Sequence, residues 1–279
     1  MSDKLKNFFI RAISGVVMFA VVLGAILGSK WSFGALVMLI TLGGEWEFYR
    51  LAKKAGTSPQ CAVGLLAGAL MIAAMVAILY NQLAITIVAM VIFMLLIPMP
   101  LIFELYRKSA TPMANVGITY AGVIYVALPM TLLMFFPTML GAGNGWQPWS
   151  VIFYIFIIWA NDVFAYLFGI TLGKHRLFER ISPKKSWEGF FGGLLGAMAM
   201  GFVAAKVLDA NVAMWIGLAL IAAITGVFGD LVESLLKRSV DVKDSGNIIP
   251  GHGGWLDRFD ALIFSVPFAF IYLVIVEFI

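Results

Sequence analysis

A stripe of polar side chains near the end of the chain could hold a cation beside a phosphate group. Four residues at spacing i, i+3, i+4 and i+7 would share one helix face: Asp230, Glu233, Ser234 and Lys237. An ion pair between Glu233 and Lys237 would explain two of these charges and leave Asp230 unpaired, one turn deeper. The residues before the stripe, 214–228, are apolar. Because charges beside a membrane are costly, the stripe indicates a functional site.

A glycine-rich segment, 250–260, follows the stripe. It holds three glycines and a histidine: Gly251, His252, Gly253 and Gly254. Glycines let the backbone approach a ligand closely and direct N–H groups at it. Asp257 and Asp260 are three residues apart at the start of the last apolar segment, so they share a helix face. Carboxylates are ligands that suit Mg²⁺, and a favourable charge at a helix N-terminus explains only one of the two.

Two further segments carry polar groups. Asp162 lies well inside the apolar run 149–171, where a carboxylate indicates function unless it makes a structural hydrogen bond between helices. The polar segment 173–189 holds five basic residues: Lys174, Arg176, Arg180, Lys184 and Lys185. Control of membrane topology would explain Lys174 and Arg176, but Ser182 and Ser186 also offer hydroxyls for a helix N-cap. A helix N-terminus beside lysines binds phosphate well.

Together these residues predict an acidic centre that converges around a divalent cation and is ringed by basic groups and a glycine loop. The four carboxylates are Asp162, Asp230, Asp257 and Asp260. Such a centre fits phosphoryl or nucleotidyl transfer with Mg²⁺. No Cys/His spacing supports zinc.

The composition of the elements that position these residues indicates a membrane protein. The 279 residues are 62% hydrophobic and only 12% charged, about half the charged share of a soluble protein, so a soluble protein is excluded. The net charge of +4 is small and does not indicate a nucleic-acid partner. The predicted fold class is an all-α polytopic membrane protein.

About nine segments are long and apolar enough to span a bilayer. They are 8–28, 31–49, 61–80, 83–103, 115–137, 149–171, 189–207, 211–235 and 259–279. With the N-terminus in the cytoplasm, all Lys and Arg residues except Lys30 and Lys206 fall on the inner side. Two regions are predicted: about five N-terminal helices in 1–137, and a catalytic region of about four helices with two polar cytoplasmic loops in 138–279.

The segment 234–260 resembles the signature of phosphatidate cytidylyltransferases, the CDP-diacylglycerol synthases. Asn161-Asp162 and the stretch from Ser182 to Gly189 also resemble that family, whereas the N-terminal half matches only in hydropathy and helix number. The resemblance implies that CTP and phosphatidate form CDP-diacylglycerol and pyrophosphate with Mg²⁺. It also implies a homodimer in the inner membrane, with an active site that faces the cytoplasm.

The resemblance implies roles for particular residues. The metal ligands are Asp230 and Asp257 first, then Asp260 and Asp162. The catalytic group consists of Asp230, Asp257, Lys237 and Arg258. The substrate-binding residues are Ser182, Lys184, Lys185, Ser186, Glu188, Ser234, Arg238, Lys243, His252, Gly253 and Gly254.

Other functions use similar residues. A CTP-dependent lipid kinase, or a Mg²⁺-dependent transferase acting on another membrane lipid phosphate, also needs carboxylates near the membrane, and acidic residues alone do not separate these enzymes. A secondary transporter for a phosphorylated anion would place polar groups near the midplane between two repeats. The polar groups here gather at one face and no repeat is visible, which disfavours transport.

Overall fold

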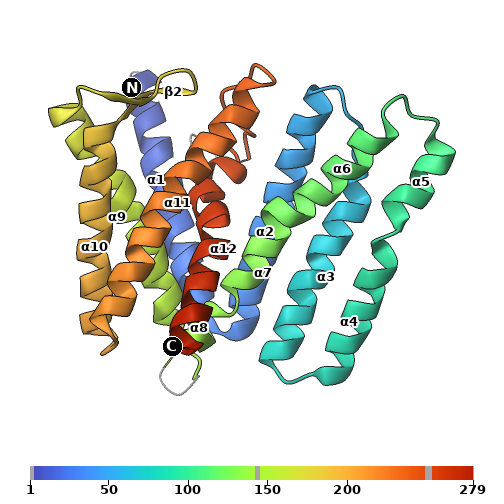
Figure 1. Cartoon of the computed structure of the whole chain (residues 1–279), viewed down its shortest axis with the longest axis horizontal. Helices are drawn as coiled ribbons and strands as arrows, with labels where there is room; N and C mark the ends of the chain where they lie inside the picture. Colours follow the sequence, from blue (N-terminus) through green and yellow to red (C-terminus); the bar gives the residue numbers. More distant parts are fainter. Residues whose placement is uncertain (1–2, 142–144, 249–252, 279) are drawn as a thin grey trace. The chain divides into compact units, whose positions relative to one another are not determined.

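The computed structural model describes residues 3–141, 145–248 and 253–278. Almost all regular structure in this part of the chain is helical, as Figure 1 shows. The elements are α1 (Asp3–Gly28), α2 (Lys30–Lys54), α3 (Cys61–Leu79), α4 (Leu83–Leu96), α5 (Met99–Arg107), α6 (Pro112–Gly122), the π-helical turn η1 (Val123–Ala127), α7 (Leu128–Leu133), α8 (Phe136–Met139), α9 (Pro148–Leu172), β1 (Arg176–Phe178), β2 (Ser182–Ser186), α10 (Trp187–Val207), α11 (Val212–Arg238) and α12 (Leu256–Phe278).

Each of the nine predicted apolar segments falls on helix. Seven helical stretches, among the described residues, are long and apolar enough to cross a bilayer: 61–79, 83–107, 112–139, 148–172, 187–207, 212–238 and 256–277. A shorter apolar stretch, Ala12–Gly28, lies in α1. These findings confirm an all-α polytopic membrane protein. The remaining predicted segment corresponds to α2, which carries two buried carboxylates, Glu45 and Glu47.

The chain divides into two compact units. One contains Met1–Met134 with Ser239–Phe259, and the other contains Phe135–Arg238 with Asp260–Ile279. Asp257 therefore belongs to the first unit, whereas Asp230 and Asp260 belong to the second.

In the first unit, α2 packs against α1, α3, α6, η1 and α7. A short turn joins α1 to α2: Ser29 is the N-cap of α2, and its side chain accepts a hydrogen bond from Ser32 N–H at 3.0 Å. The hydroxyl of Tyr49, a fully buried residue of α2, donates to Thr119 O on α6 at 2.8 Å. Gly64 of α3 lies so close to the ring of Tyr49 that a Cβ there would overlap it. Small residues thus bring these helices together, as is typical of membrane bundles.

In the second unit, α9 and α10 lie side by side and α11 packs against both (Figure 1). The glycines of α10 make this close approach possible, because a Cβ at Gly192 or Gly196 would overlap Phe168 or Phe164 of α9. The hydroxyl of Tyr154 on α9 donates to Ser265 Oγ on α12 at 2.8 Å, and both residues are fully buried.

The connection between α9 and α10 is an antiparallel hairpin of β1 and β2, in which Arg176 pairs with Ser186 and Phe178 with Ser182. The sequence predicts only a polar loop here. The hairpin leads directly into α10 and so fixes where its basic residues lie.

Candidate active site

The polar stripe on α11 forms as its spacing predicts. Lys237 Nζ lies 2.5 Å from Glu233 Oε2, and their side chains are only 11% and 1% exposed. Ser234 Oγ donates to Asp230 Oδ1 at 3.3 Å. Asp230 is not left unpaired, however, because Lys185 of β2 forms an ion pair with it. The Glu233–Lys237 pair accounts for two of the four polar residues, and the partner of Asp230 comes from the hairpin, outside the helix.

A third carboxylate reaches this stripe from α12. Asp230, Glu233 and Asp260 each offer one oxygen within 4.8 Å of the others, which makes them a possible metal-binding group among the described residues. Glu233 and Asp260 are buried, and Asp260 Oδ1 accepts a hydrogen bond from Ala261 N–H at 2.8 Å. Three carboxylates so close together repel one another unless cations neutralise them. Lys185 and Lys237 supply two such charges.

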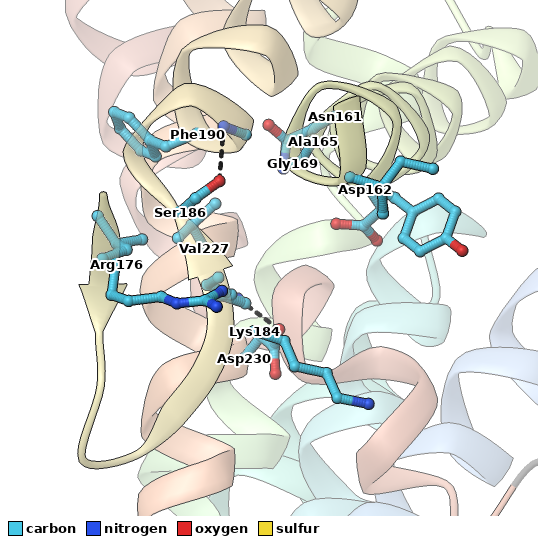
Figure 2. A pocket seen from close by; sticks show the side chains of 15 residues that line it. Asn161, Asp162, Ala165, Gly169, Arg176, Lys184, Ser186, Phe190, Val227 and Asp230 are labelled. Atoms are coloured by element: carbon cyan, nitrogen blue, oxygen red, sulfur yellow. Dashed lines mark hydrogen bonds and ion pairs between the residues drawn. The ribbon is translucent and has the colours of Figure 1, made fainter. Parts of the chain in front are cut away.

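A cavity of about 510 Å³ adjoins this cluster in the second unit, within the size range of small-molecule sites. Its lining is partly polar, from Asp162, Arg176, Lys184, Lys185 and Asp230, and partly apolar, from Tyr166, Ile170, Leu177, Phe190 and Val227. Figure 2 shows the carboxylate of Asp162 and the guanidinium of Arg176 pointing into the same space from α9 and β1. Asp162 interacts electrostatically with both Lys185 and Asp230. The cavity thus combines charged groups that suit a phosphate or a cation with a wall that suits a lipid chain.

The start of α10 forms one edge of the cavity. Ser186 is the N-cap residue, and its hydroxyl accepts a hydrogen bond from Gly189 N–H at 3.1 Å, which confirms the predicted cap (Figure 2). Ser182 lies at the start of β2 and does not cap this helix. Lys184 is exposed and lines the cavity, whereas Lys185 is occupied with Asp230.

Glu188 holds the start of the hairpin. Its carboxylate accepts hydrogen bonds from Lys174 N–H at 3.1 Å and His175 N–H at 3.3 Å, and Oε1 lies 2.7 Å from His175 Nδ1. These contacts show what Glu188 does in the fold. Its predicted part in substrate binding stays a prediction.

Asp257 has partners in the first unit. Its Oδ2 accepts three hydrogen bonds, from Ser245 N–H, Ser245 Oγ and Gly254 N–H, each at 2.9 Å. Gly253 has φ +85°, and a Cβ there would come within 2.9 Å of the same oxygen.

For three other predicted site residues of this region, the feature that bears on their role is their exposure to solvent. Arg238, Lys243 and Arg258 are exposed, and His252 lies outside the described residues. Their predicted roles stay predictions.

Two carboxylates, Glu233 and Glu47, make contacts that the sequence did not lead us to expect. Glu233 was interpreted only as the partner of Lys237, although its oxygens also lie next to those of Asp230 and Asp260. Glu47 received no role, although it is fully buried in α2 and accepts hydrogen bonds from Ser245 and Leu256. The available signal was a pair of carboxylates, Glu45 and Glu47, inside a predicted membrane helix.

Comparison with known proteins identifies the family. A model described as the cytidylyltransferase family matches residues 9–276. The chain belongs to the cytidylyltransferase family. This match confirms the family resemblance. It also extends the resemblance to the N-terminal half, which matched the family only in hydropathy and helix number.

Individual members of the cytidylyltransferase family are also similar to this chain. Proteins named phosphatidate cytidylyltransferase from Staphylococcus saprophyticus and Staphylococcus aureus (strain COL) are 45% and 46% identical to it over 126 residues. One from Staphylococcus epidermidis (strain RP62A) is 44% identical over 126 residues. Each of these matches covers 44% of this chain and 48% of the relative, so the chain spans about half the length of the curated relatives it matches.

Proposed function

We propose that this protein is an integral-membrane phosphatidate cytidylyltransferase that makes CDP-diacylglycerol and pyrophosphate from CTP and phosphatidate. The observation that carries the proposal is the cluster of Asp230, Glu233 and Asp260 beside a cavity that is both charged and apolar. A lipid phosphate needs a site with both charged and apolar surfaces, because its acyl chains stay in the bilayer while its headgroup and the nucleotide are polar. We place the reaction at the cytoplasmic face of the inner membrane, where CTP is available, and the catalytic residues in 138–279.

The carboxylate cluster fits Mg²⁺. Asp230, Glu233 and Asp260 would hold the ion, since each offers a carboxylate oxygen within 4.8 Å of the others and carboxylate oxygens are hard ligands that suit Mg²⁺. Asp230 and Asp260 would be ligands, with Glu233 beside them, and Asp162, which lines the same cavity as Asp230, would be a further one. The sequence-based assignment of Asp257 as a further ligand is kept as part of the proposal. When bound, Mg²⁺ supplies positive charge that neutralises the triphosphate.

The chain's own residues would bind and orient the two substrates. Lys184, Lys185 and Arg176 face the cavity with their charges, so they would hold phosphate oxygens of the lipid or the nucleotide. An oxygen of the phosphatidate phosphate forms a bond to the α-phosphorus of CTP, and the bond from that phosphorus to the bridging oxygen of the β-phosphate breaks. Pyrophosphate leaves with the bonding electrons. No protein nucleophile is needed, so positioning and charge are the protein's main contributions.

The assignment of the remaining residues follows the family resemblance. Ser182, Ser186, Glu188 and Ser234 would line the phosphate path, with Lys237, Arg238, Lys243, Arg258, His252, Gly253 and Gly254 around it. We also infer a homodimer within the membrane.

The test is a reconstitution with purified protein in detergent, labelled CTP, phosphatidate and Mg²⁺, scored for both CDP-diacylglycerol and pyrophosphate. Asp230→Asn should reduce turnover at least about a hundredfold, the scale of losing one charge-stabilising group. Asp209→Asn is the matched control, since Asp209 is exposed between α10 and α11 with φ +49°, a conformation that Asn also adopts. Full activity of Asp230→Asn would remove the cluster from the site. Turnover with a prenol in place of phosphatidate, or phosphate transfer without pyrophosphate release, would assign the protein to one of the alternative enzymes.

A further inference from the structure

We propose that Glu47 is a positioning residue that fixes the described residues of one segment, 244–248 and 253–257, and through them the carboxylate of Asp257. The proposal rests on the proposed function in one respect, because Asp257 must serve the reaction for its position to matter. Every contact that carries it lies within the first compact unit.

Glu47 is a fully buried carboxylate in a helix predicted to cross the membrane. Its Oε2 accepts hydrogen bonds from Ser245 Oγ at 2.7 Å and from Leu256 N–H at 2.9 Å. Leu256 is the first residue of α12. The N–H groups of the first residues of a helix have no partner within that helix. A residue of α2 therefore caps α12, across 209 positions of sequence.

The backbone of the segment approaches Glu47 more closely than most residues would allow. A Cβ at Gly246 or at Gly254 would overlap the carboxyl group of Glu47, so glycine is required at both positions. Gly43 lies one turn before Glu47 on the same face of α2, and a Cβ there would come within 2.6 Å of the indole of Trp255. One face of α2 is thus shaped to receive this segment. This packing gives Gly254 a structural reason that does not involve a ligand.

Ser245 connects Glu47 to Asp257. Its hydroxyl lies 2.7 Å from Glu47 Oε2 and 2.9 Å from Asp257 Oδ2, so a single side chain contacts both carboxylates. The N–H groups of Ser245 and Gly254 donate to the same Asp257 oxygen. Because Glu47 fixes the hydroxyl of Ser245 and packs against Gly254, it determines where the donors to Asp257 stand. Residues that orient a reacting carboxylate in this way typically affect activity 10- to 100-fold.

Glu45 provides a matched control. It is also fully buried in α2, only two residues away, but both of its oxygens lack a hydrogen-bond partner among the described residues. A Cβ at Gly68 of α3 would come within 2.5 Å of Glu45 Oε2, so this side chain packs against α3. Removing the carboxylate of Glu45 therefore breaks no hydrogen bond to the described residues of this segment, 244–248 and 253–257.

The experiment measures hydrogen exchange at the amides of Ser245, Gly254 and Leu256 without substrates, and turnover separately. In Glu47→Ala the exchange should be at least about tenfold faster: the amide of Leu256 loses its bond to Glu47, and the amides of Ser245 and Gly254 lose the support that holds them at Asp257. Turnover should fall by about 10- to 100-fold. Glu47→Gln keeps one carbonyl acceptor, so its exchange rates and its turnover should lie between those of wild type and Glu47→Ala. Glu45→Ala and Glu45→Gln should change neither quantity.

A second variant keeps the test decisive if Glu47→Ala does not fold. Ser245→Ala removes only the connecting hydroxyl and should reproduce the loss of turnover with Glu47 in place. Unchanged exchange or unchanged turnover in both the Glu47 and the Ser245 variants would overturn the proposal, as would equal losses in the Glu45 variants. A wild-type protein that makes no CDP-diacylglycerol would instead refute the proposed function, and the exchange data would then decide whether Glu47 fixes the segment.

Discussion

Replacement of Lys185 by Ala should increase the affinity of the candidate site for Mg²⁺. The same replacement should lower the turnover of the protein. The ammonium group of Lys185 pairs with Asp230, one of the three clustered carboxylates. Under the proposed function this ammonium group would compete with Mg²⁺ for the carboxylate of Asp230. It also faces the cavity, where its charge can act on a phosphate.

The size of the expected change in Mg²⁺ affinity follows from the charge that is removed. A unit charge about 5 Å from the ion at an effective dielectric of 20 is worth roughly 3 kcal/mol. The side chains of Lys185 and Asp230 are 25% and 44% exposed, so solvent screening reduces this to about 1 kcal/mol. The half-saturating Mg²⁺ concentration should then fall about fivefold. Turnover should fall by about 10- to 100-fold, because a group that stabilises charge on the transferred phosphate is lost.

The assay is a Mg²⁺ titration of the initial rate at saturating CTP and phosphatidate. Lys206→Ala is the matched control, since Lys206 lies in the last turn of α10, at the opposite end of that helix from Lys185. An unchanged or raised half-saturating concentration in Lys185→Ala would refute the competition between Lys185 and the metal. The same shift in Lys206→Ala would show that only the net charge matters.

Two further predictions concern the same unit. Asp260→Asn should raise the half-saturating Mg²⁺ concentration at least about tenfold while the protein still inserts, because one of the proposed ligands is lost. The same titration measures this change, and an unchanged concentration would remove Asp260 from the ligand set. Ser186→Ala should lower the free energy of unfolding by about 1 kcal/mol through loss of the bond from Gly189 N–H, whereas Ser186→Gly should lower it by only a few tenths. Denaturation of the purified variants measures the difference, and equal losses would count against the cap.

The helices and the polar stripe were predictable because both follow from local periodicity. Each apolar segment of about 20 residues became helix, and the spacing of Asp230, Glu233 and Lys237 fixed their common face. The N-cap at Ser186 was also predictable, because capping depends on a few neighbouring residues.

The hairpin that presents Lys185 was not predictable in the same way. Its strands are three and five residues long, and β2 reads Ser-Pro-Lys-Lys-Ser, without the alternation of apolar and polar residues that indicates a strand. Topology control is a sufficient explanation for a basic loop, so the sequence gives no reason to choose one lysine over its neighbour. The fold decides it: both lysines line the cavity, and Lys185 is the one that forms an ion pair with Asp230.

The role of Glu47 shows where sequence reasoning reaches its limit. On a helix, residues two apart are separated by about 200°, so Glu45 and Glu47 must face different neighbours. That much follows from the sequence and already argues against one common role for the pair. Which neighbour each one meets depends on contacts across the fold, and Ser245 lies 198 residues from Glu47. A buried carboxylate without such donors gains nothing from its charge, whereas one that holds Ser245 and the first amide of α12 stabilises a particular arrangement of the backbone. The difference between the two glutamates is therefore tertiary, and it is the difference that the hydrogen-exchange comparison measures.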